Sequence, residues 1–449
     1  MAERFDLLVR NGSCVTPGGT LPADVGVTGG RIAAVGDLSS AAAAEEVDAA
    51  GLHVLPGLID SQVHFRDPGF PDCETIEAGC RGAALGGVAT VFDMPNTDPA
   101  IDSVERFRWK TEYVQGKLWC NIGFYVGATK DNIDDLAELE RQPGCCGIKV
   151  FAGSSTGNLL VEDDESLEAV MRSGFRRIAY HSEDEYRLRE RRAMLKPGDP
   201  YERHAEWRDV ECALRCTQRI VALARKTGRR AHILHVSTAE EMAFLKDHKE
   251  LVSVEVLPNH ITHVAPECYD NLGGIAVMNP PVRGPEHYQA IWMAVRSGLV
   301  DVVASDHAPH TREAKKRPYP DTPAGMTGVQ TTVPVMLDHV NAGRLTIERL
   351  VDLMAAGPAR IFGLSSKGRL AVGYDGDLTL VDLRHKQTIT DNWIASVCGW
   401  TAFDGVEVTG WPRMTVVGGH IVMREDEILG EPRGSLARFG DCLPPEEGR

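Results

Sequence analysis

The feature that most limits how this chain can fold is a series of short apolar runs separated by longer helical segments. Eight runs occupy the middle of the chain: Gly57–Phe65, Val88–Met94, Cys120–Val126, Gly147–Phe151, Arg177–His181, Ala231–Val236, Val252–Leu257 and Val300–Ser305. Helix-like stretches separate most of them, for example Glu74–Leu85, Asp209–Thr227 and Ala239–Lys249. Alternating strands and helices favour a parallel sheet, and eight units favour a closed barrel. We therefore predict an α/β fold built on a TIM-type (β/α)8 barrel.

The two ends of the chain have a different pattern. Short β-like segments lie at 5–10, 24–28 and 31–35 near the start, and at 378–382, 414–417 and 420–423 near the end. Asn11-Gly12, Gly29-Gly30 and Gly418-Gly419 are expected to form turns between them. We predict that the flanks, residues 1–54 and 367–449, fold together as a small β-sandwich domain. The barrel domain would then span residues 55–366.

The composition is that of a large, acidic, folded protein. Of its 449 residues, 43% are hydrophobic, which is ample for a large core. The formal net charge of −16 argues against nucleic acid and anionic membranes as partners, and leaves a small-molecule substrate. No apolar run approaches the roughly 20 residues that span a bilayer, and the start has no signal-peptide core. The 11 cysteines are scattered without a CxxC pair, so we expect a reduced, cytoplasmic protein.

Residues that can bind a cation stand at the ends of several apolar runs. Asp60, Gln62 and His64 alternate in the first run, so their side chains point to the same side of a strand. Three later runs end in similar chemistry, at His181, His235 and Asp306. A single histidine on an apolar strand is more often a core residue. Several at strand ends, where barrels carry their chemistry, favour a metal site.

Lys149 lies within the fourth apolar run, where a lysine is unfavourable unless it is paired or neutral. One interpretation is an ion pair with Asp60 or Asp306. The other is covalent: a neutral lysine reacts with carbon dioxide to give a carbamate, an oxygen ligand that can bridge two metal ions. Burial lowers the pKa of lysine and so favours the neutral form that reacts. Both interpretations remain open from the sequence.

Residues suited to holding a carboxylate follow the strand ends. Arg66 offers a planar fork of donors, and Asn96 and His310 follow two other runs. Simpler interpretations are an ion pair between Arg66 and Asp67 and a turn closed by Asn96. Asn279 precedes two prolines. The first interpretation of this stretch is a turn, and the second is a residue of the pocket.

A polar segment, Thr311–Thr322, follows the last apolar run and is rich in Lys, Arg and Pro. It is long for a connection between a strand and a helix. It is either a mobile lid over the strand ends or an ordinary surface loop.

Together these motifs resemble the cyclic amidohydrolases of the amidohydrolase superfamily, and most closely the dihydroorotases. The matching stretches are Val63–Gly69, Glu74–Gly79, Met94–Thr97, Gly147–Lys149, His235–Thr238, Asn279–Pro281 and Asp306–His310. They occur in the family's order across essentially the whole chain. Each stretch alone is modestly specific, whereas the ordered set is very specific.

The resemblance implies roles for these residues. The metal ligands for one or two zinc ions would be Gln62, His64, Lys149 as a bridging carbamate, His181, His235 and Asp306. The substrate carboxylate would be held by Arg66, Asn96 and His310, and Asn279 would touch the ring. The implied reaction is the reversible interconversion of L-dihydroorotate and N-carbamoyl-L-aspartate in pyrimidine synthesis. Asp306 would take a proton from the attacking water and pass it to the leaving nitrogen.

Gln62 departs from the family pattern, which has histidine at this place. In the family this position and that of His64 bind one metal ion, so we expect the first metal position to be weakened or differently filled. Dihydroorotase-like relatives with this glutamine also carry a stretch similar to Gly153–Asn158. The substitution is therefore consistent with an active subgroup.

Two alternatives to a dihydroorotase remain. One is another cyclic amidohydrolase, a hydantoinase or an allantoinase, although Arg66 and Asn96 would have no carboxylate to bind on an uncharged ring. The other is a catalytically silent relative that serves as a partner of aspartate transcarbamoylase. Such relatives usually lack several ligands, whereas only one is altered here. We also expect a homo-oligomer, either a dimer or a tetramer.

Overall fold

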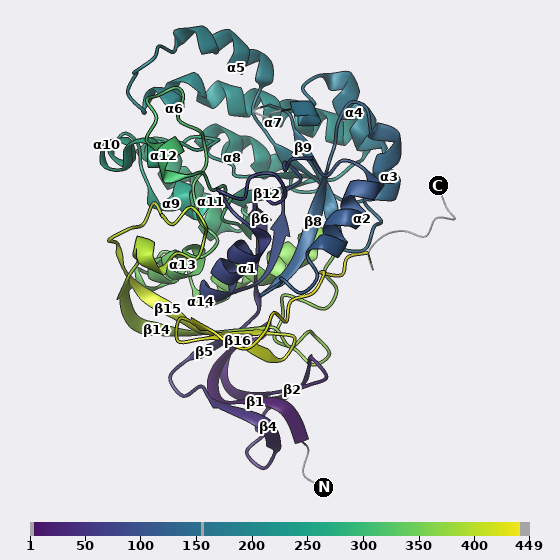
Figure 1. The fold of residues 1–449 in the computed structure, drawn as a ribbon, viewed down its shortest axis with the longest axis vertical. Coiled ribbons are helices and arrows are strands. Elements are labelled where there is room, and N and C mark those ends of the chain that lie inside the picture. The colour runs from purple at the N-terminus through teal and green to yellow at the C-terminus, as the bar shows by residue number, and fades with distance from the viewer. Residues whose placement is uncertain (1–3, 154–156, 441–449) are drawn as a thin grey trace.

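The centre of the molecule is a parallel barrel. The structure is a computed structural model, and it describes residues 4–153 and 157–440. Eight parallel strands follow one another in chain order: β6 (Leu58–Val63), β7 (Val88–Asp93), β8 (Asn121–Gly127), β9 (Cys145–Phe151), β10 (Ile178–His181), β11 (Ala231–Ile233), β12 (Val252–Val256) and β13 (Val302–Val303). A parallel bridge between Val63 and His307 joins the first strand to the segment after the last. The predicted barrel is confirmed (Figure 1).

Helices surround the barrel strands (Figure 1). They are α1 (Ile76–Leu85), α2 (Val104–Tyr113), α3 (Leu136–Leu139), α4 (Asp164–Arg172), α5 (Glu185–Arg191), α6 (Arg203–Trp207), α7 (Val210–Thr227), α8 (Ala239–Leu245), α9 (Pro258–Thr262), α10 (Glu267–Leu272), α11 (Pro285–Ser297), α12 (Arg312–Lys315), α13 (Thr332–Asn341), α14 (Ile347–Val351) and α15 (Gly357–Phe362). The three helices predicted from the sequence are present as α1, α7 and α8. Thr75 and Asp209 are the N-caps of α1 and α7, since their side chains accept a backbone N–H of the first turn.

The flanks of the chain form one mixed sheet of nine strands beside the barrel. Its strands are β1 (Arg4–Thr16), β2 (Gly19–Thr28), β3 (Arg31–Gly36), β4 (Ala42–Asp48), β5 (His53–Pro56), β14 (Leu378–Thr388), β15 (Glu407–Val417), β16 (His420–Arg424) and β17 (Glu427–Ile428). The antiparallel pairing of β5 with β14 joins the N-terminal to the C-terminal flank. The flanks therefore fold together as predicted, while the exact domain limits stay a prediction.

One predicted turn is wrong. Asn11-Gly12 does not end a strand, because β1 continues through it with an irregularity in register between Val9 and Gly12. Asn11 has a φ of 60°, the left-handed conformation that a turn would also have required. An extra residue at positive φ within a strand produces a bulge, so the same sequence signal serves a bend in the sheet.

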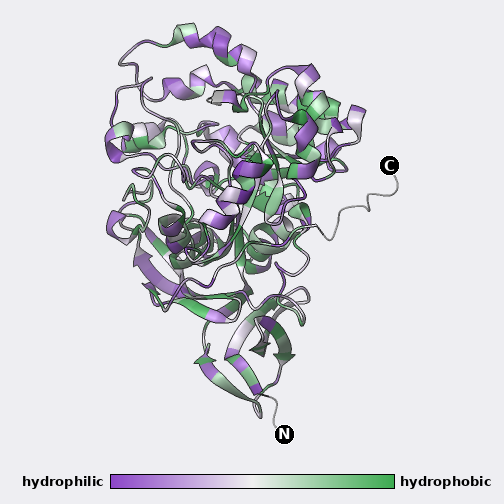
Figure 2. Ribbon diagram, turned by 45° about the vertical axis from the view of Figure 1, so that its right-hand side comes forward, coloured by the Kyte–Doolittle hydropathy of each residue, from purple (hydrophilic) through white to green (hydrophobic). Residues whose placement is uncertain are grey.

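The apolar residues concentrate where the strands meet the helices. In Figure 2 the strands at the centre of the barrel are mainly green, and the helices at the top of the view carry much purple. Both flanks contribute to a separate core in the small sheet, where Val9 and Val25 pack with Leu378 and Val416. Among the described residues, no helix is both long and apolar enough to cross a membrane.

The polar segment Thr311–Thr322 is anchored to the barrel. It contains the short helix α12, whose N-cap is Thr311. Lys315 is buried, and its ammonium group donates to the carbonyl oxygens of Val277, Pro323 and Gly325 at 2.8–2.9 Å. Whether the segment also opens as a lid stays a prediction.

Candidate active site

The predicted metal ligands gather at the carboxyl ends of the barrel strands. They lie near or just beyond the strand ends: Gln62 and His64 at β6, Lys149 at β9, His181 at β10, His235 after β11 and Asp306 after β13. All of them are buried. Because parallel strands end at the same edge of a barrel, residues that are far apart in the chain share one site.

Asp306 is the centre of a first group of contacts. Its Oδ1 accepts a hydrogen bond from Gln62 Nε2 at 2.8 Å and lies 3.1 Å from His64 Nε2. The other ring nitrogen of His64, Nδ1, lies 2.6 Å from Asn96 Oδ1. If Nδ1 carries the proton and donates to Asn96, the lone pair of His64 Nε2 faces the carboxylate. Two acceptors that face each other suit a shared cation.

His181 and His235 form a second group. His181 Nδ1 lies 3.1 Å from His235 Nε2, and His181 Nε2 lies 2.7 Å from the carboxylate of Glu183. Glu183 therefore selects the tautomer with the proton on Nε2, which leaves the Nδ1 lone pair facing His235. Burial lowers the pKa of both histidines, so both rings are neutral, the form that binds metals.

Lys149 lies close enough to influence both groups. Burial lowers its pKa to about 7, although the charge of Asp306 opposes this effect. Its own charge lowers the pKa of His64 in one group and of His181 and His235 in the other. No ion pair joins Lys149 to Asp60 or Asp306, and Asp60 Oδ1 instead accepts from the backbone N–H of Ser305 at 3.0 Å. The ion-pair interpretation of Lys149 is therefore wrong.

Without a further ligand, the donor atoms of the site are an incomplete set for a divalent cation. Within residues 4–153 and 157–440, no group of three or more His, Cys, Asp or Glu side chains converges on one point. The site instead offers two pairs of donors with Lys149 near both. Gln62 Oε1 and His235 Nδ1 are buried without a hydrogen-bond partner in the described part of the chain. A ligand supplied between the two pairs would complete a site of neutral imidazoles and a carboxylate, which zinc accepts.

Three residues of the site have a strained backbone. Arg66, His235 and Asp306 have φ angles of 56°, 40° and 47°, in the left-handed region that L-residues rarely adopt. Such conformations cost about 1–3 kcal/mol each and persist only where the surroundings impose them. Their presence on three different barrel loops supports a functional role for this end of the barrel.

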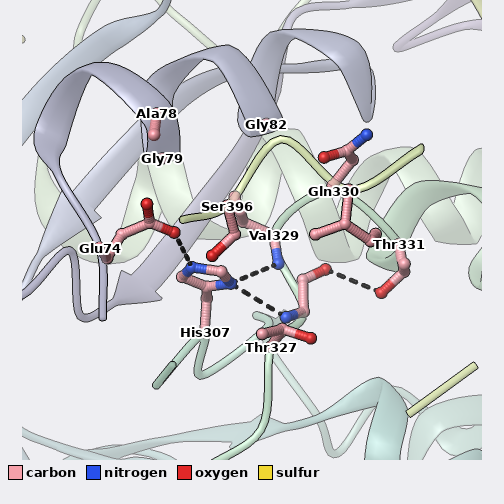
Figure 3. A pocket seen from close by; sticks show the side chains of 12 residues that line it. Glu74, Ala78, Gly79, Gly82, His307, Thr327, Val329, Gln330, Thr331 and Ser396 are labelled. Carbon is pink, nitrogen blue, oxygen red and sulfur yellow. Dashed lines mark hydrogen bonds and ion pairs between the residues drawn. The ribbon is translucent and has the colours of Figure 1, made fainter. Parts of the chain in front are cut away.

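A buried pair supports the loop that carries Asp306. Glu74 Oε2 lies 3.0 Å from His307 Nε2, and His307 Nδ1 accepts from the backbone N–H of Gly328 at 3.1 Å (Figure 3). The carbonyl of His307 accepts from the backbone N–H of His64 at 2.7 Å. The residue next to Asp306 is thus bonded to Glu74 just before α1, to the backbone at Gly328 and to the end of β6.

A cavity of about 670 Å³ opens beside these residues. The four predicted substrate contacts line it: Arg66, Asn96, Asn279 and His310. The Arg66 Nε atom is buried and has no hydrogen-bond partner among the described residues. Asp67, its alternative partner, instead accepts from Ile76 N at 3.1 Å and from the Tyr113 hydroxyl at 3.3 Å. Arg66 is therefore a cation at the cavity wall that forms no ion pair with a described carboxylate, although the charges of Asp306 and Asp93 act on it.

The other three predicted substrate contacts are uncharged, although Asp98 also lines the cavity. Burial, assisted by the charges of Arg66 and Lys315, lowers the pKa of His310 to about 3. Asn96 contacts His64 rather than closing a turn, and Asn279 accepts from Arg208 Nε at 2.7 Å. The stretch Gly153–Asn158 also reaches the cavity at Asn158, and its residues 154–156 lie outside the described part of the chain.

The sequence did not reveal several supporting residues. Glu183, Arg208 and His204 are buried beside the site, and Glu74 and His307 support the loop of Asp306. None of these five residues was assigned a role from the sequence. The one available signal was a set of charged residues at strand ends, such as Glu183 two positions after His181. Contacts between separate barrel loops leave no pattern in a single sequence.

Comparison with known proteins places this site in a family. Residues 53–422 match the model of the amidohydrolase family. The chain belongs to this family. It is 32% identical over 442 residues to dihydroorotase of Methanosarcina mazei, with 95% of this chain and 96% of that protein covered.

Other relatives carry different names. An allantoinase of Deinococcus radiodurans is 35% identical over 451 residues, covering 97% of this chain and 99% of that protein. L-Hydantoinase from Arthrobacter aurescens has a similar structure, with a TM-score of 0.91 at 28% identity and coverage of 97% of this chain and 100% of that one. The chain is accordingly a hydrolase that acts on cyclic amides, and the choice among such substrates depends on its cavity.

Proposed function

We propose that this hydrolase is a zinc-dependent dihydroorotase, which interconverts L-dihydroorotate and N-carbamoyl-L-aspartate in pyrimidine synthesis. The observation that carries the proposal is Arg66, a cavity-lining guanidinium whose buried Nε has no partner in the described residues. An arginine in such a place favours a carboxylate, which it can bind through two parallel hydrogen bonds. Dihydroorotate carries a carboxylate on its ring, whereas hydantoin does not.

Two further residues of the cavity wall complement this charge. Asn96 and His310 lie on the cavity wall with Arg66, and both are uncharged, so neither repels an anion. Because Asn96 Oδ1 faces His64 Nδ1, its amide N–H₂ group is left to donate. The three residues then offer a carboxylate one charged fork and further neutral contacts.

Asp306 is the general base and acid of the proposal. Gln62 Nε2 and His64 Nε2 both lie against its Oδ1, and no described residue donates to Oδ2. Oδ2 can then take a proton from the attacking water and return it to the ring nitrogen as the amide bond breaks. Zinc, when bound, polarises the amide carbonyl and acidifies water.

Lys149 would hold zinc as a carbamate. Its neutral amine adds to carbon dioxide, a C–N bond forms, and one proton is released. The product replaces a buried cation with an anion near both donor pairs, which is the ligand that the site otherwise lacks. His64, Asp306, His181 and His235 would hold the zinc together with this carbamate.

An allantoinase is the second candidate, because the allantoinase of Deinococcus radiodurans is 35% identical to this chain. Allantoin has a ureido substituent and no carboxylate. An allantoinase would therefore leave the Arg66 guanidinium without an anionic partner. This consideration favours dihydroorotate, and the same residue provides the test.

The test compares Arg66→Ala with the wild-type protein on L-dihydroorotate, hydantoin and allantoin. A hydrogen bond to a charged group contributes about 1.5–3 kcal/mol, so kcat/KM for dihydroorotate should fall about 10- to 100-fold. Arg66→Lys, which keeps the charge without the fork, should retain part of the rate. An unchanged kcat/KM for dihydroorotate in Arg66→Ala would refute the carboxylate role.

A further inference from the structure

The amide of Asn279 has a defined orientation at the cavity wall. Its Oδ1 accepts from Arg208 Nε at 2.7 Å and lies 3.0 Å from His204 Nε2. An arginine can only donate, so the atom that faces Arg208 must be the oxygen. The Nδ2 group has no acceptor among the described residues, and Asn279 lines the cavity.

His204 fixes the same orientation independently. It is buried, and its Nε2 lies 3.0 Å from the carbonyl oxygen of Met278 as well as 3.0 Å from Asn279 Oδ1. Nε2 faces two acceptors and so carries the ring proton, while Nδ1 is left to accept from the Tyr319 hydroxyl at 3.2 Å. Burial lowers the pKa of His204 to about 3, so the ring is neutral and keeps this tautomer.

Arg208 is itself held in place. Its Nη1 lies 3.1 Å from Glu183 Oε2, the carboxylate oxygen that also contacts His181 Nε2 at 2.7 Å. Arg283 Nη1 donates to the backbone carbonyl of Arg208 at 3.0 Å. One buried network therefore connects a ligand of the proposed metal site to a residue of the cavity wall.

We propose that Arg208 and His204 are positioning residues that turn the Asn279 amide so that Nδ2 donates into the cavity, where it selects rings with a carbonyl oxygen at that place. The ligand class is the cyclic ureides. Their carbonyl between two ring nitrogens is the acceptor that remains when the other ring carbonyl is attacked. The inference rests on the proposed function for the choice of ring, and on the contacts above for the orientation.

The experiment uses L-dihydroorotate and its 2-thio analogue, in which sulfur, a weaker acceptor, replaces the ureide oxygen. We call L-dihydroorotate the oxygen ring and its 2-thio analogue the sulfur ring. Asn279→Ala should lower kcat/KM about tenfold for the oxygen ring, which is the effect of one lost hydrogen bond. For the sulfur ring, kcat/KM should stay within about twofold of the wild-type value. Asn279→Asp should be slower still with the oxygen ring, because a carboxylate oxygen would face the ureide oxygen. Equal losses on the two rings, or a wild-type rate in Asn279→Asp, would overturn the donor role.

The positioning role has its own readout. Arg208→Lys keeps a cation beside Glu183 but lacks the Nε–H donor, so the preference for the oxygen ring over the sulfur ring should shrink several-fold. Arg215→Lys, on the exposed side of α7 beside Glu211, is the matched control and should keep the wild-type preference. Thermal unfolding establishes that each variant is folded. An unchanged preference in folded Arg208→Lys would overturn the positioning role.

Failure of the proposed function can be told apart from failure of this inference. If the wild-type protein opens hydantoin or allantoin and leaves L-dihydroorotate intact, the dihydroorotase proposal fails. The same variants are then compared on hydantoin and 2-thiohydantoin, which share the ureide carbonyl. A tenfold loss confined to the oxygen ring would still support the donor role, and equal losses would still overturn it.

Discussion

At the scale of single residues, Gln62 stands where the resembling family has a histidine. Its Nε2 donates to Asp306 Oδ1 at 2.8 Å, and its Oε1 is buried without a partner in the described residues. An amide used in this way holds the carboxylate of Asp306. It is also a weaker metal ligand than imidazole. One of the two proposed metal positions should therefore bind less tightly than the other.

Gln62→His should tighten the weaker zinc position about tenfold or more, because it adds an imidazole ligand. The measurement is zinc per chain after dialysis against a graded series of chelator concentrations. Gln62→Met, of similar size and without a nitrogen ligand, is the control and should not raise the zinc content. If Gln62→His binds no more zinc than the wild-type protein, Gln62 already serves as a ligand.

Lys149 is the residue on which both donor pairs depend. Lys149→Met keeps the length of the side chain but cannot form a carbamate, so we expect zinc binding to be lost. Lys110→Met is a matched control, because Lys110 is equally buried but pairs with Asp93 at 2.6 Å, in a separate ion pair. It should destabilise the protein and leave zinc bound. Zinc retained in Lys149→Met would contradict the carbamate.

At the scale of elements, the barrel interior carries a polar network beneath the site. Glu255 in β12 accepts from the Ser61 hydroxyl of β6 at 3.0 Å and lies 3.2 Å from His232 Nε2 of β11. His232 Nδ1 lies 2.7 Å from the Ser253 hydroxyl. Burial raises the pKa of Glu255 to about 8, whereas burial lowers that of His232 to about 3. A protonated Glu255 Oε2 that donates to a neutral His232 connects the four side chains without a net charge, while Glu255 Oε1 is buried without a partner among the described residues.

This network makes stability depend on pH in a defined direction. Folding raises the pKa of Glu255 from 4.5 to about 8, so the folded state keeps a proton that the unfolded state loses in this interval. The free energy of unfolding should fall with rising pH by up to about 1.4 kcal/mol per unit. The contribution is complete below the unfolded pKa and is lost as the pH rises through about 8.

Glu255→Gln should remove this slope, because glutamine does not titrate. The measurement is urea unfolding in the presence of chelator, from about pH 5 to about pH 8. The free energy of unfolding of the variant should rise relative to that of the wild-type protein as the pH rises. Glu250→Gln, at an exposed carboxylate, is the control and should follow the wild-type curve. Parallel curves for Glu255→Gln and the wild-type protein would mean that Glu255 is ionised in the fold.

The elements themselves were largely predictable. All eight barrel strands lie within or beside the apolar runs, because strands covered on both faces must be apolar throughout. The helices α1 and α7 begin directly after their N-cap residues, Thr75 and Asp209. The bulge at Asn11-Gly12 was not predictable, because a turn and a bulge need the same positive φ, and only the pairing of β1 with β2 distinguishes them.

At the scale of the whole molecule, the flanking sheet joins the two ends of the chain. The antiparallel contact of β5 with β14 connects segments more than 300 residues apart. A single sequence predicted that the flanks share a pattern, but the order of the nine strands depends on pairings that leave no local signal. Association of the molecule into a dimer or tetramer, or with aspartate transcarbamoylase, stays a prediction.

The site shows the same division between what the sequence predicts and what only the fold supplies. Asp60, Gln62 and His64 could be grouped from their spacing in one apolar run, and the barrel rule placed His181, His235 and Asp306 near them. Lys149 could be singled out because a lysine is unusual in an apolar strand. The supporting contacts of Glu183 and Arg208 arise where separate loops meet, so they required the structure.

The central claim is that the cavity is built for an anionic cyclic amide. The most direct measurement is the hydrolysis of L-dihydroorotate, hydantoin and allantoin by the purified full chain, with zinc determined on the same sample. We predict bound zinc and a kcat/KM for L-dihydroorotate of about 10⁴ M⁻¹s⁻¹ or more, at least about tenfold above the uncharged rings. Folded, zinc-loaded protein that opens hydantoin or allantoin and leaves L-dihydroorotate intact would contradict the claim.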